Sequence, residues 1–170
     1  MTGGGRIALV PLARRHAART RAWANDRDLM RLMDRVRQVG EAEHEAWLEA
    51  LARRDDCAYF AIELPPDGTH VGNVWLWNID ARHRKAELRI VVGDAAARGK
   101  GVGAEAIDAL CRHAFDSLGL HRVYACVLAI NPRARTAFER ARFRLEGTLR
   151  DDRRGDDGFV DAWLLARLSD

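Results

Sequence analysis

Lysine is nearly absent from this 170-residue sequence, which contains only Lys85 and Lys100. The net charge of +3 therefore comes almost entirely from arginine. Acidic residues such as Glu41, Glu43 and Glu45 are interspersed among the arginines. Because they interrupt any continuous basic stripe, we expect no nucleic-acid partner.

Cysteine and long apolar runs are also scarce. The three cysteines, Cys57, Cys111 and Cys126, are odd in number and far apart in apolar segments. This pattern predicts reduced core thiols and excludes both a disulfide framework and a metal cluster, so we expect no metal. The longest unbroken apolar run, residues 123–130, is too short to cross a bilayer, and residues 1–10 lack the apolar core of a signal peptide. We therefore expect a cytoplasmic protein with no membrane partner.

A chain of this length with 48% apolar residues can bury one continuous core, so residues 1–170 are expected to form a single domain. Alternating or β-branched apolar residues predict strands at 6–12, 59–64, 71–79, 87–92 and 121–130, and two more on either side of a turn at 153–158. Two helical segments are expected at 14–32 and 41–53. Three- and four-residue apolar spacing predicts a helix at 101–118, and Pro132 predicts the start of a short helix at 132–140. The turn chemistry of residues 65–68 predicts a hairpin. The helix that starts near Gly101 connects two predicted strands, so that pair should be parallel.

A glycine-rich stretch lies between the strand at 87–92 and the helix that follows it. Its residues are Arg98, Gly99, Lys100, Gly101, Val102 and Gly103. The glycines allow a ligand to approach the backbone closely, and the two cations add charge beside the amides. The start of a helix offers free N–H groups and a positive dipole end to an anion. The stretch therefore predicts binding of a pyrophosphate group.

Two other nucleotide-binding motifs fit this stretch less well. A P-loop needs a glycine at the position of Asp94 and a serine or threonine at the position of Gly101. A dinucleotide fingerprint matches residues 101–106, but the next strand ends at Ile130-Asn131 without the acidic residue that binds ribose. A simple turn needs fewer glycines and cations than this stretch contains.

In form and position, the stretch resembles the acetyl-CoA loop of the GNAT superfamily of N-acetyltransferases. That loop has the form Arg/Gln-x-x-Gly-x-Gly/Ala after a strand, which Arg98, Gly101 and Gly103 match. Residues 92–101 are particularly similar to the branch that contains ribosomal-protein N-terminal acetyltransferases and amino-sugar N-acetyltransferases. The combination of motifs is more specific than any one of them.

Further matches bring the resemblance to residues 6–168. Asn131, residues 138–140 and Phe143 stand where that family has an asparagine, an aromatic-Glu-Lys run and a Gly-Phe pair. Residues 146–150 resemble its EG-x-LR segment, and residues 23–26 and 43–47 fit the same branch more loosely.

The sequence departs from the family at three positions near the expected site. Many members have a tyrosine that protonates the departing thiolate, where this chain has Phe138. Ala134 replaces a common serine, and Arg142 replaces the glycine of the Gly-Phe pair. A thiolate with a pKa of about 8.5 can leave without a side-chain acid, so an active enzyme is still expected.

The resemblance implies an α/β fold with a mixed, mostly antiparallel central sheet that is splayed at the cofactor site and flanked by helices. It also implies that the backbone of Val91 and Val92 pairs with the pantetheine arm of acetyl-CoA, that residues 98–103 hold the pyrophosphate, and that Asn131 and Phe138 contact the cofactor. The residues alone are equally consistent with Val91 and Val92 as ordinary core and with Asn131 as a helix N-cap.

Glu87 is the expected catalytic base. An ammonium acceptor must lose a proton before it attacks the thioester, and a carboxylate can take that proton directly or through water. Glu87 lies on the strand that leads into the glycine-rich stretch, and several GNAT enzymes have a glutamate at the comparable position. The alternative is that Glu87 pairs with Arg89 or Lys85 on a solvated face.

Four residues are candidates for the acceptor site: Trp23, Asn25, Trp75 and Trp77. Trp75 and Trp77 are two residues apart on one strand and therefore point the same way. Core packing is the alternative for the tryptophans, and simple exposure for the asparagine.

These residues together predict an acetyl-CoA-dependent N-acetyltransferase that acts on a primary amine. The favoured acceptor is a protein N-terminal or peptide amine, and the alternative is an amino-sugar or nucleotide-sugar amine. A protein of another class, a CoA-binding regulatory module without turnover, would also fit the replacements at Ala134 and Phe138. A homodimer is expected only from the family.

Overall fold

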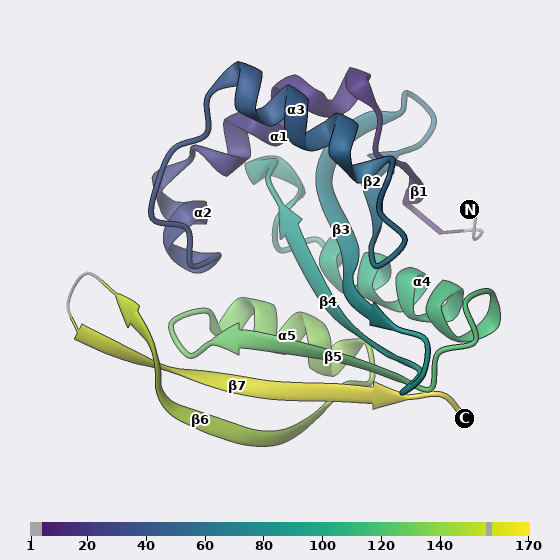
Figure 1. Cartoon of the computed structure of the whole chain (residues 1–170), viewed down its shortest axis with the longest axis vertical. Coiled ribbons are helices and arrows are strands. Elements are labelled where there is room, and N and C mark those ends of the chain that lie inside the picture. Colours follow the sequence, from purple (N-terminus) through teal and green to yellow (C-terminus); the bar gives the residue numbers. More distant parts are fainter. Residues whose placement is uncertain (1–4, 156–157) are drawn as a thin grey trace.

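The computed structural model describes residues 5–155 and 158–170, which form a mixed α/β structure around one twisted sheet (Figure 1). The seven strands have the order β1-β2-β3-β4-β5-β7-β6, and every neighbouring pair is antiparallel except β4 and β5. The strands are β1 Ala8–Pro11, β2 Ala58–Leu64, β3 Thr69–Asp80, β4 Lys85–Val92, β5 Arg122–Leu128, β6 Arg144–Gly155 and β7 Gly158–Leu168. The helices are η1 Arg14–His16, α1 Ala17–Ala24, α2 Arg27–Leu32, α3 Glu41–Leu51, η2 Ala95–Ala97, α4 Val102–Asp116 and α5 Pro132–Arg140.

The structure confirms the hairpin at residues 65–68, where the Gly68 amide donates to the Leu64 carbonyl over 3.0 Å. It also confirms the helix at 132–140 and the parallel pairing across the helix that follows the glycines. The predicted helix at 14–32 is wrong, because the chain breaks after α1. There Asp26 leaves the helical conformation and its carboxylate accepts the Leu29 amide over 2.9 Å, which starts α2 as a separate helix. The centre of the predicted turn at 153–158 lies outside the described residues, and its first residues belong to β6.

The two faces of the sheet carry different side chains. Along β4, Ala86 and Leu88 point to the face that α4 covers, where they join the main apolar core. The large side chains at the centre of this core are Leu9, Ile62, Leu76, Leu88, Ile107, Leu110 and Leu165. Because side chains alternate along a strand, Glu87 points to the opposite face, on the side of α1 and α3. A buried charge on β4 is thereby kept out of the main core.

The sheet splays between β4 and β5, as expected. The two strands pair at only three positions, and the last of these is Glu87 opposite Tyr124. Beyond it β5 continues alongside β7 to Leu128, whereas β4 continues alongside β3 to Val92, so the strands diverge (Figure 1). Glu87 therefore stands at the apex of the splay.

All three cysteines are free thiols, in agreement with the prediction of reduced cysteines. Cys111 is fully buried, and burial raises the pKa of its thiol to about 12. Cys57 and Cys126 are half-buried. Among the described residues, no helix combines the length and the apolar character needed to cross a membrane.

Candidate active site

The glycine-rich stretch forms the turn into α4. Gly99 and Gly101 have φ values of 76° and 85°, in the left-handed region that favours glycine. Gly101 is the N-cap of α4, and Val102 begins the helix. The first amides of a helix have no partner within it, so this turn directs N–H groups and the positive end of the α4 dipole toward one point. The two left-handed glycines and the helix start lie as the sequence predicts, and pyrophosphate binding by residues 98–103 stays a prediction.

Arg98 connects this turn to the end of β4. Its guanidinium donates to the carbonyl oxygens of Val92 and Gly93, each over 2.9 Å. These bonds hold the loop against the strand, whereas the side chain of Lys100 is exposed. Contact between Arg98 or Lys100 and a cofactor stays a prediction.

Arg6 is a further cation at this turn that sequence analysis missed. Its Nη2 atom lies 3.0 Å from the position that a Cβ at Gly101 would take. The Arg6 guanidinium also pairs with Glu105 in the first turn of α4, with Nε 2.9 Å from Oε1. No local pattern could identify Arg6, because 99 positions separate it from Glu105.

The residues expected along the cofactor lie beside the splay. Val91 and Val92 end β4, and the Cγ2 atom of Val92 lies 3.7 Å from the position that a Cβ at Gly103 would take. Asn131 caps α5 by accepting the Ala134 amide over 3.1 Å. The N-cap role of Asn131 is thereby confirmed, and its contact with a cofactor stays a prediction.

Phe138 is buried and 3% exposed. It packs against Phe143, with 5.0 Å between ring centroids. Its burial matches an apolar wall rather than a proton donor, and its contact with a cofactor also stays a prediction.

Glu87 is only 9% exposed and forms a two-pronged ion pair with Arg89. The Nε and Nη2 atoms of Arg89 lie 2.8 and 3.3 Å from the two carboxylate oxygens. The pairing with Arg89 that was considered as the alternative is therefore present at the apex of the splay, with the Arg89 side chain 47% exposed and the Glu87 side chain 11% exposed. Tyr124, which sequence analysis also missed, stands opposite Glu87 in the register. Burial, and next the charge of Glu87, raise the pKa of the Tyr124 hydroxyl.

An aromatic cavity of about 40 Å³, which we call the inner cavity, lies on the same face of the sheet as Glu87. Its aromatic walls are Trp23, Trp47, Tyr59 and Trp75. Tyr59 stacks on Trp75 with 4.9 Å between centroids and an interplanar angle of 11°. Val91 of β4 lines the same cavity, so the cavity reaches the strand that borders the splay.

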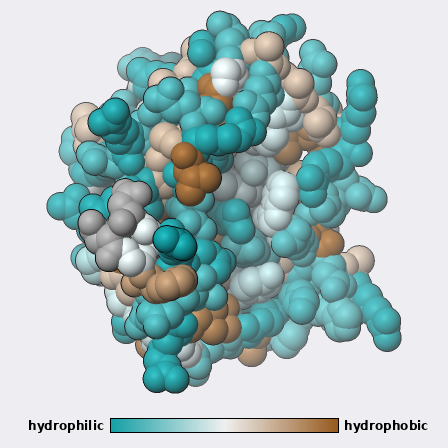
Figure 2. Space-filling view, turned by 60° about the vertical axis from the view of Figure 1, so that its left-hand side comes forward, coloured by the Kyte–Doolittle hydropathy of each residue, from teal (hydrophilic) through white to brown (hydrophobic). Residues whose placement is uncertain are grey.

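A second cavity of about 280 Å³, which we call the outer cavity, adjoins the first. The two share Thr20, Ala24, Arg35 and Trp47. Figure 2 brings the side of α2 forward and shows a hollow in this face, with hydrophilic residues around a few hydrophobic ones. A larger cavity of about 350 Å³ lies elsewhere, between β1 and α3, and its lining residues come from these elements and from the segments next to them.

The four predicted acceptor residues have different surroundings. Trp23 and Trp75 line the inner cavity. Trp77 packs beneath the Arg54 guanidinium, 4.2 Å from its ring centroid. The Asn25 amide bonds the backbone of Val39 twice, over 2.7 and 3.0 Å, and so holds the segment between α2 and α3. Contact of any of the four with an acceptor stays a prediction.

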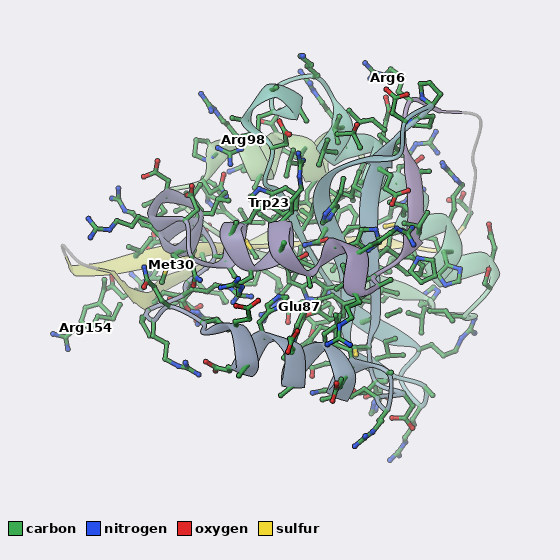
Figure 3. The ribbon with its side chains drawn as sticks, turned by 90° about the horizontal axis from the view of Figure 1, so that it is seen from above. Arg6, Trp23, Met30, Glu87, Arg98 and Arg154 are labelled. Atoms are coloured by element: carbon green, nitrogen blue, oxygen red, sulfur yellow. The ribbon has the colours of Figure 1, made fainter. Side chains whose placement is uncertain are left out.

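Trp23 connects the inner cavity with the segment that leads to the glycine turn. A Cβ at Gly93 would lie 2.0 Å from Cδ2 of Trp23, so the indole packs directly on this glycine. On another side His70 contacts the indole, with 4.7 Å between centroids. Seen from above, Trp23 lies between Arg98 and Glu87 (Figure 3). Gly93 thus allows α1 to approach the end of β4.

Gly93→Ala is expected to destabilise the protein by about 1–3 kcal/mol, because the methyl group overlaps the Trp23 ring. Urea unfolding would measure this loss. In a Trp23→Ala background, which removes the ring, the same substitution should be nearly neutral. An equal loss in both backgrounds would show that the Trp23 contact is not the cause.

Within residues 5–155 and 158–170, no group of three or more His, Cys, Asp or Glu side chains is arranged to hold a metal ion.

Comparison with known proteins gives one family. A sequence model described as acetyltransferase (GNAT) domain matches residues 6–144. The Bacillus subtilis protein "Putative ribosomal N-acetyltransferase YdaF" is 36% identical over 85 residues, which cover 50% of this chain and 46% of that protein. "Probable N-acetyltransferase YjcK" from the same organism is 31% identical over 119 residues, which cover 68% of this chain and 64% of that protein. The chain thus spans between about half and two thirds of the length of these relatives.

Solved structures share the fold. The crystal structure of spermidine N-acetyltransferase from Vibrio cholerae, in complex with CoA and spermine, matches with a TM-score of 0.90 at 24% identity. The match covers 96% of this chain and 95% of that chain.

Proposed function

This chain belongs to the GNAT acetyltransferase family, and from that premise we propose that it transfers an acetyl group from acetyl-CoA to a primary amine. The observation that carries the proposal is the placement of Glu87 at the apex of the splayed strands. Acetyl-CoA supplies the thioester carbonyl that the amine attacks. We propose residues 1–170 as a single acetyltransferase domain.

The residues that would hold acetyl-CoA follow the splay toward the glycine turn. The left-handed glycines and the start of α4 would bind the pyrophosphate, with Arg6 and Lys100 beside it. The end of β4 at Val91 and Val92, next to the opening between the strands, would pair with the pantetheine arm.

Glu87 would accept the proton that an ammonium acceptor must lose, directly or through one water molecule. Arg89 orients the carboxylate through its two bonds and so acts as a positioning residue. Phe138 cannot donate a proton to the departing thiolate. A thiol pKa near about 8.5 lets the thiolate leave unprotonated or take a proton from water.

For the acceptor, we favour a protein N-terminal or peptide amine. The name of the relative YdaF, a ribosomal N-acetyltransferase, supports this choice. So does the outer cavity, whose wall includes the highly exposed residues Val36 and Arg37 and therefore opens to a large partner. An amino-sugar amine is the alternative within the same chemistry.

The experiment that tests the proposal measures thiol release from acetyl-CoA with a panel of peptide, amino-sugar and polyamine acceptors. We expect release of CoA with at least one primary amine, and binding of acetyl-CoA by calorimetry. Tight binding with no thiol release for any amine would contradict the proposal and indicate a CoA-binding module without turnover.

We also propose that two copies associate through the hairpin of β6 and β7. Apolar side chains are exposed there, including Phe159 at 65%, Leu145 at 42% and Leu149 at 40%. Because β6 is an edge strand, it can accept a further strand from a second copy. Sedimentation analysis would measure the mass in solution, and we expect the mass of a dimer.

A further inference from the structure

Arg35, the arginine that lines both cavities, has no acidic partner among the described residues, and its position points to the acceptor's chemistry. We propose that the acceptor carries an anionic group, a carboxylate or a phosphate, that binds Arg35 while the amine of the same molecule reaches Glu87. This inference rests on the proposed acetyl transfer and specifies its substrate class.

Arg35 belongs to the segment between α2 and α3, and this segment is tied down at both ends. The Arg35 amide donates to the Met30 carbonyl over 2.9 Å. Four residues later, the backbone of Val39 forms two bonds with the side chain of Asn25. Arg35 is thus presented to the inner and outer cavities from a fixed backbone.

Three other arginines around this face are paired with carboxylates. Arg37 binds Glu43 through both of its terminal nitrogens. Arg89 binds Glu87 at 2.8 Å, and Arg153 binds Asp34 at 3.1 Å. In contrast, no carboxylate in the part of the chain that the structure describes lies within ion-pair distance of Arg35. Within each of these ion pairs the two charges cancel, so the positive charge of Arg35 is left uncompensated at the two cavities.

The charge of Arg35 also acts on its surroundings. Burial, then the charges of Arg21 and Arg35, lower the pKa of His44, which keeps this imidazole neutral near pH 7. His44 lines the outer cavity and is 4% exposed, and its Nε2 atom is buried without a hydrogen-bond partner among the described residues. His44 therefore adds no second positive charge to the wall of the outer cavity.

An anion bound at Arg35 would form the ion pair that no carboxylate of the described residues forms with this arginine. A carboxylate or a phosphate can accept two parallel N–H bonds from a guanidinium, with strong directionality. Trp47 lies in both cavities and Tyr59 in the inner one, so aromatic rings can contact the body of such a molecule. Val91 and Arg35 line the same small cavity, and Val91 belongs to the strand that carries Glu87, so an anion at Arg35 would lie beside that strand.

A polyamine would not form a favourable ion pair at Arg35. Its additional ammonium groups would approach Arg35, while the nearby carboxylates Glu43, Glu87 and Asp34 are already paired with arginines. Like charges repel each other, and because Arg35 is exposed this repulsion is strongest at low ionic strength. We therefore expect this chain to differ in acceptor from the spermine-bound protein whose fold it shares.

The test compares acceptors that differ only in the anion. One pair is the peptide amides Ser-Glu-Ala-Ala and Ser-Gln-Ala-Ala, and the other is glucosamine 6-phosphate and glucosamine. We expect the anionic member of one pair to have a kcat/KM at least about tenfold higher, and spermidine to be the poorest acceptor. A preference within the peptide pair would show that the anion is a carboxylate, and a preference within the sugar pair would show that it is a phosphate.

Variants assign that preference to one residue. Arg35→Gln should reduce the ratio between the two members to below about threefold, while kcat/KM for the neutral member changes little. The matched control is Arg31→Gln, which removes the same charge from an exposed position on α2, outside the sets of residues that line the two cavities. The control should keep the wild-type ratio.

Acceptor binding can be followed without turnover, because Trp23, Trp47 and Trp75 line the inner cavity. Titration of indole fluorescence should give a lower dissociation constant for the anionic member, and Arg35→Gln should remove the difference. Equal affinities for both members, or an equal loss for both in Arg35→Gln, would overturn this inference. Absence of thiol release with every amine would instead contradict the proposed function, and the fluorescence titration would still decide the role of Arg35.

Discussion

Glu87→Gln is expected to lower turnover by about 10²-fold or more and to leave the dissociation constant of acetyl-CoA nearly unchanged. Glutamine has the shape of glutamate but cannot take the proton of the ammonium acceptor. Glu87 stands at the apex of the splay and away from the glycine turn, so coenzyme binding should not depend on its charge. Thiol release under saturating acetyl-CoA would measure turnover, and calorimetry would measure the affinity.

Two further variants distinguish the loss of a proton acceptor from the structural effect of removing a buried charge. Glu63→Gln makes the same chemical change in another carboxylate that is mostly buried and ion-paired, on β2, and turnover should be retained. Arg89→Gln leaves the Glu87 carboxylate in place but removes its orienting partner, so its loss of turnover should be smaller than that of Glu87→Gln. Unchanged turnover in Glu87→Gln would remove Glu87 from the mechanism.

Gly101→Glu should raise the dissociation constant of acetyl-CoA by about 10²-fold or more. The φ of 85° at Gly101 strains any residue with a Cβ, so the turn that presents the amides of α4 would distort. The new carboxylate would also stand at the helix N-terminus, where it repels the pyrophosphate. Calorimetric titration of the folded variant with acetyl-CoA would measure the change.

The other end of α4 offers a matched control in Gly119→Glu. Gly119 has a φ of 64°, and no heavy atom of the described residues lies within 4 Å of the position that a Cβ there would take. This substitution therefore adds similar backbone strain without crowding. Both variants should lose about 1–2 kcal/mol of stability, but only Gly101→Glu should lose coenzyme affinity. Equal coenzyme affinities in the two variants would contradict the assignment of the pyrophosphate to this turn.

The features that could be predicted from the sequence are those set by residues close together in the chain. The glycines of the turn, the cap at Asn131 and the hairpin at residues 65–68 each depend on backbone preferences over a few positions. The strand, loop and helix order around the turn also predicted the parallel pair of β4 and β5. The family resemblance added the splay of the sheet, which no local pattern contains.

The tertiary structure alone decided which side chains meet around the site. It brought Arg6 to Gly101, packed Trp23 on Gly93, and buried Glu87 against the exposed side chain of Arg89. The break after α1 had a local signal in the N-cap Asp26, but the Asn25 amide also holds it through a residue 14 positions away. Contacts of this kind depend on packing between distant segments, whose free energies outweigh local propensity. The sequence therefore determined the glycine turn and the order of the elements, whereas packing across the sheet determined the inner and outer cavities and their charge.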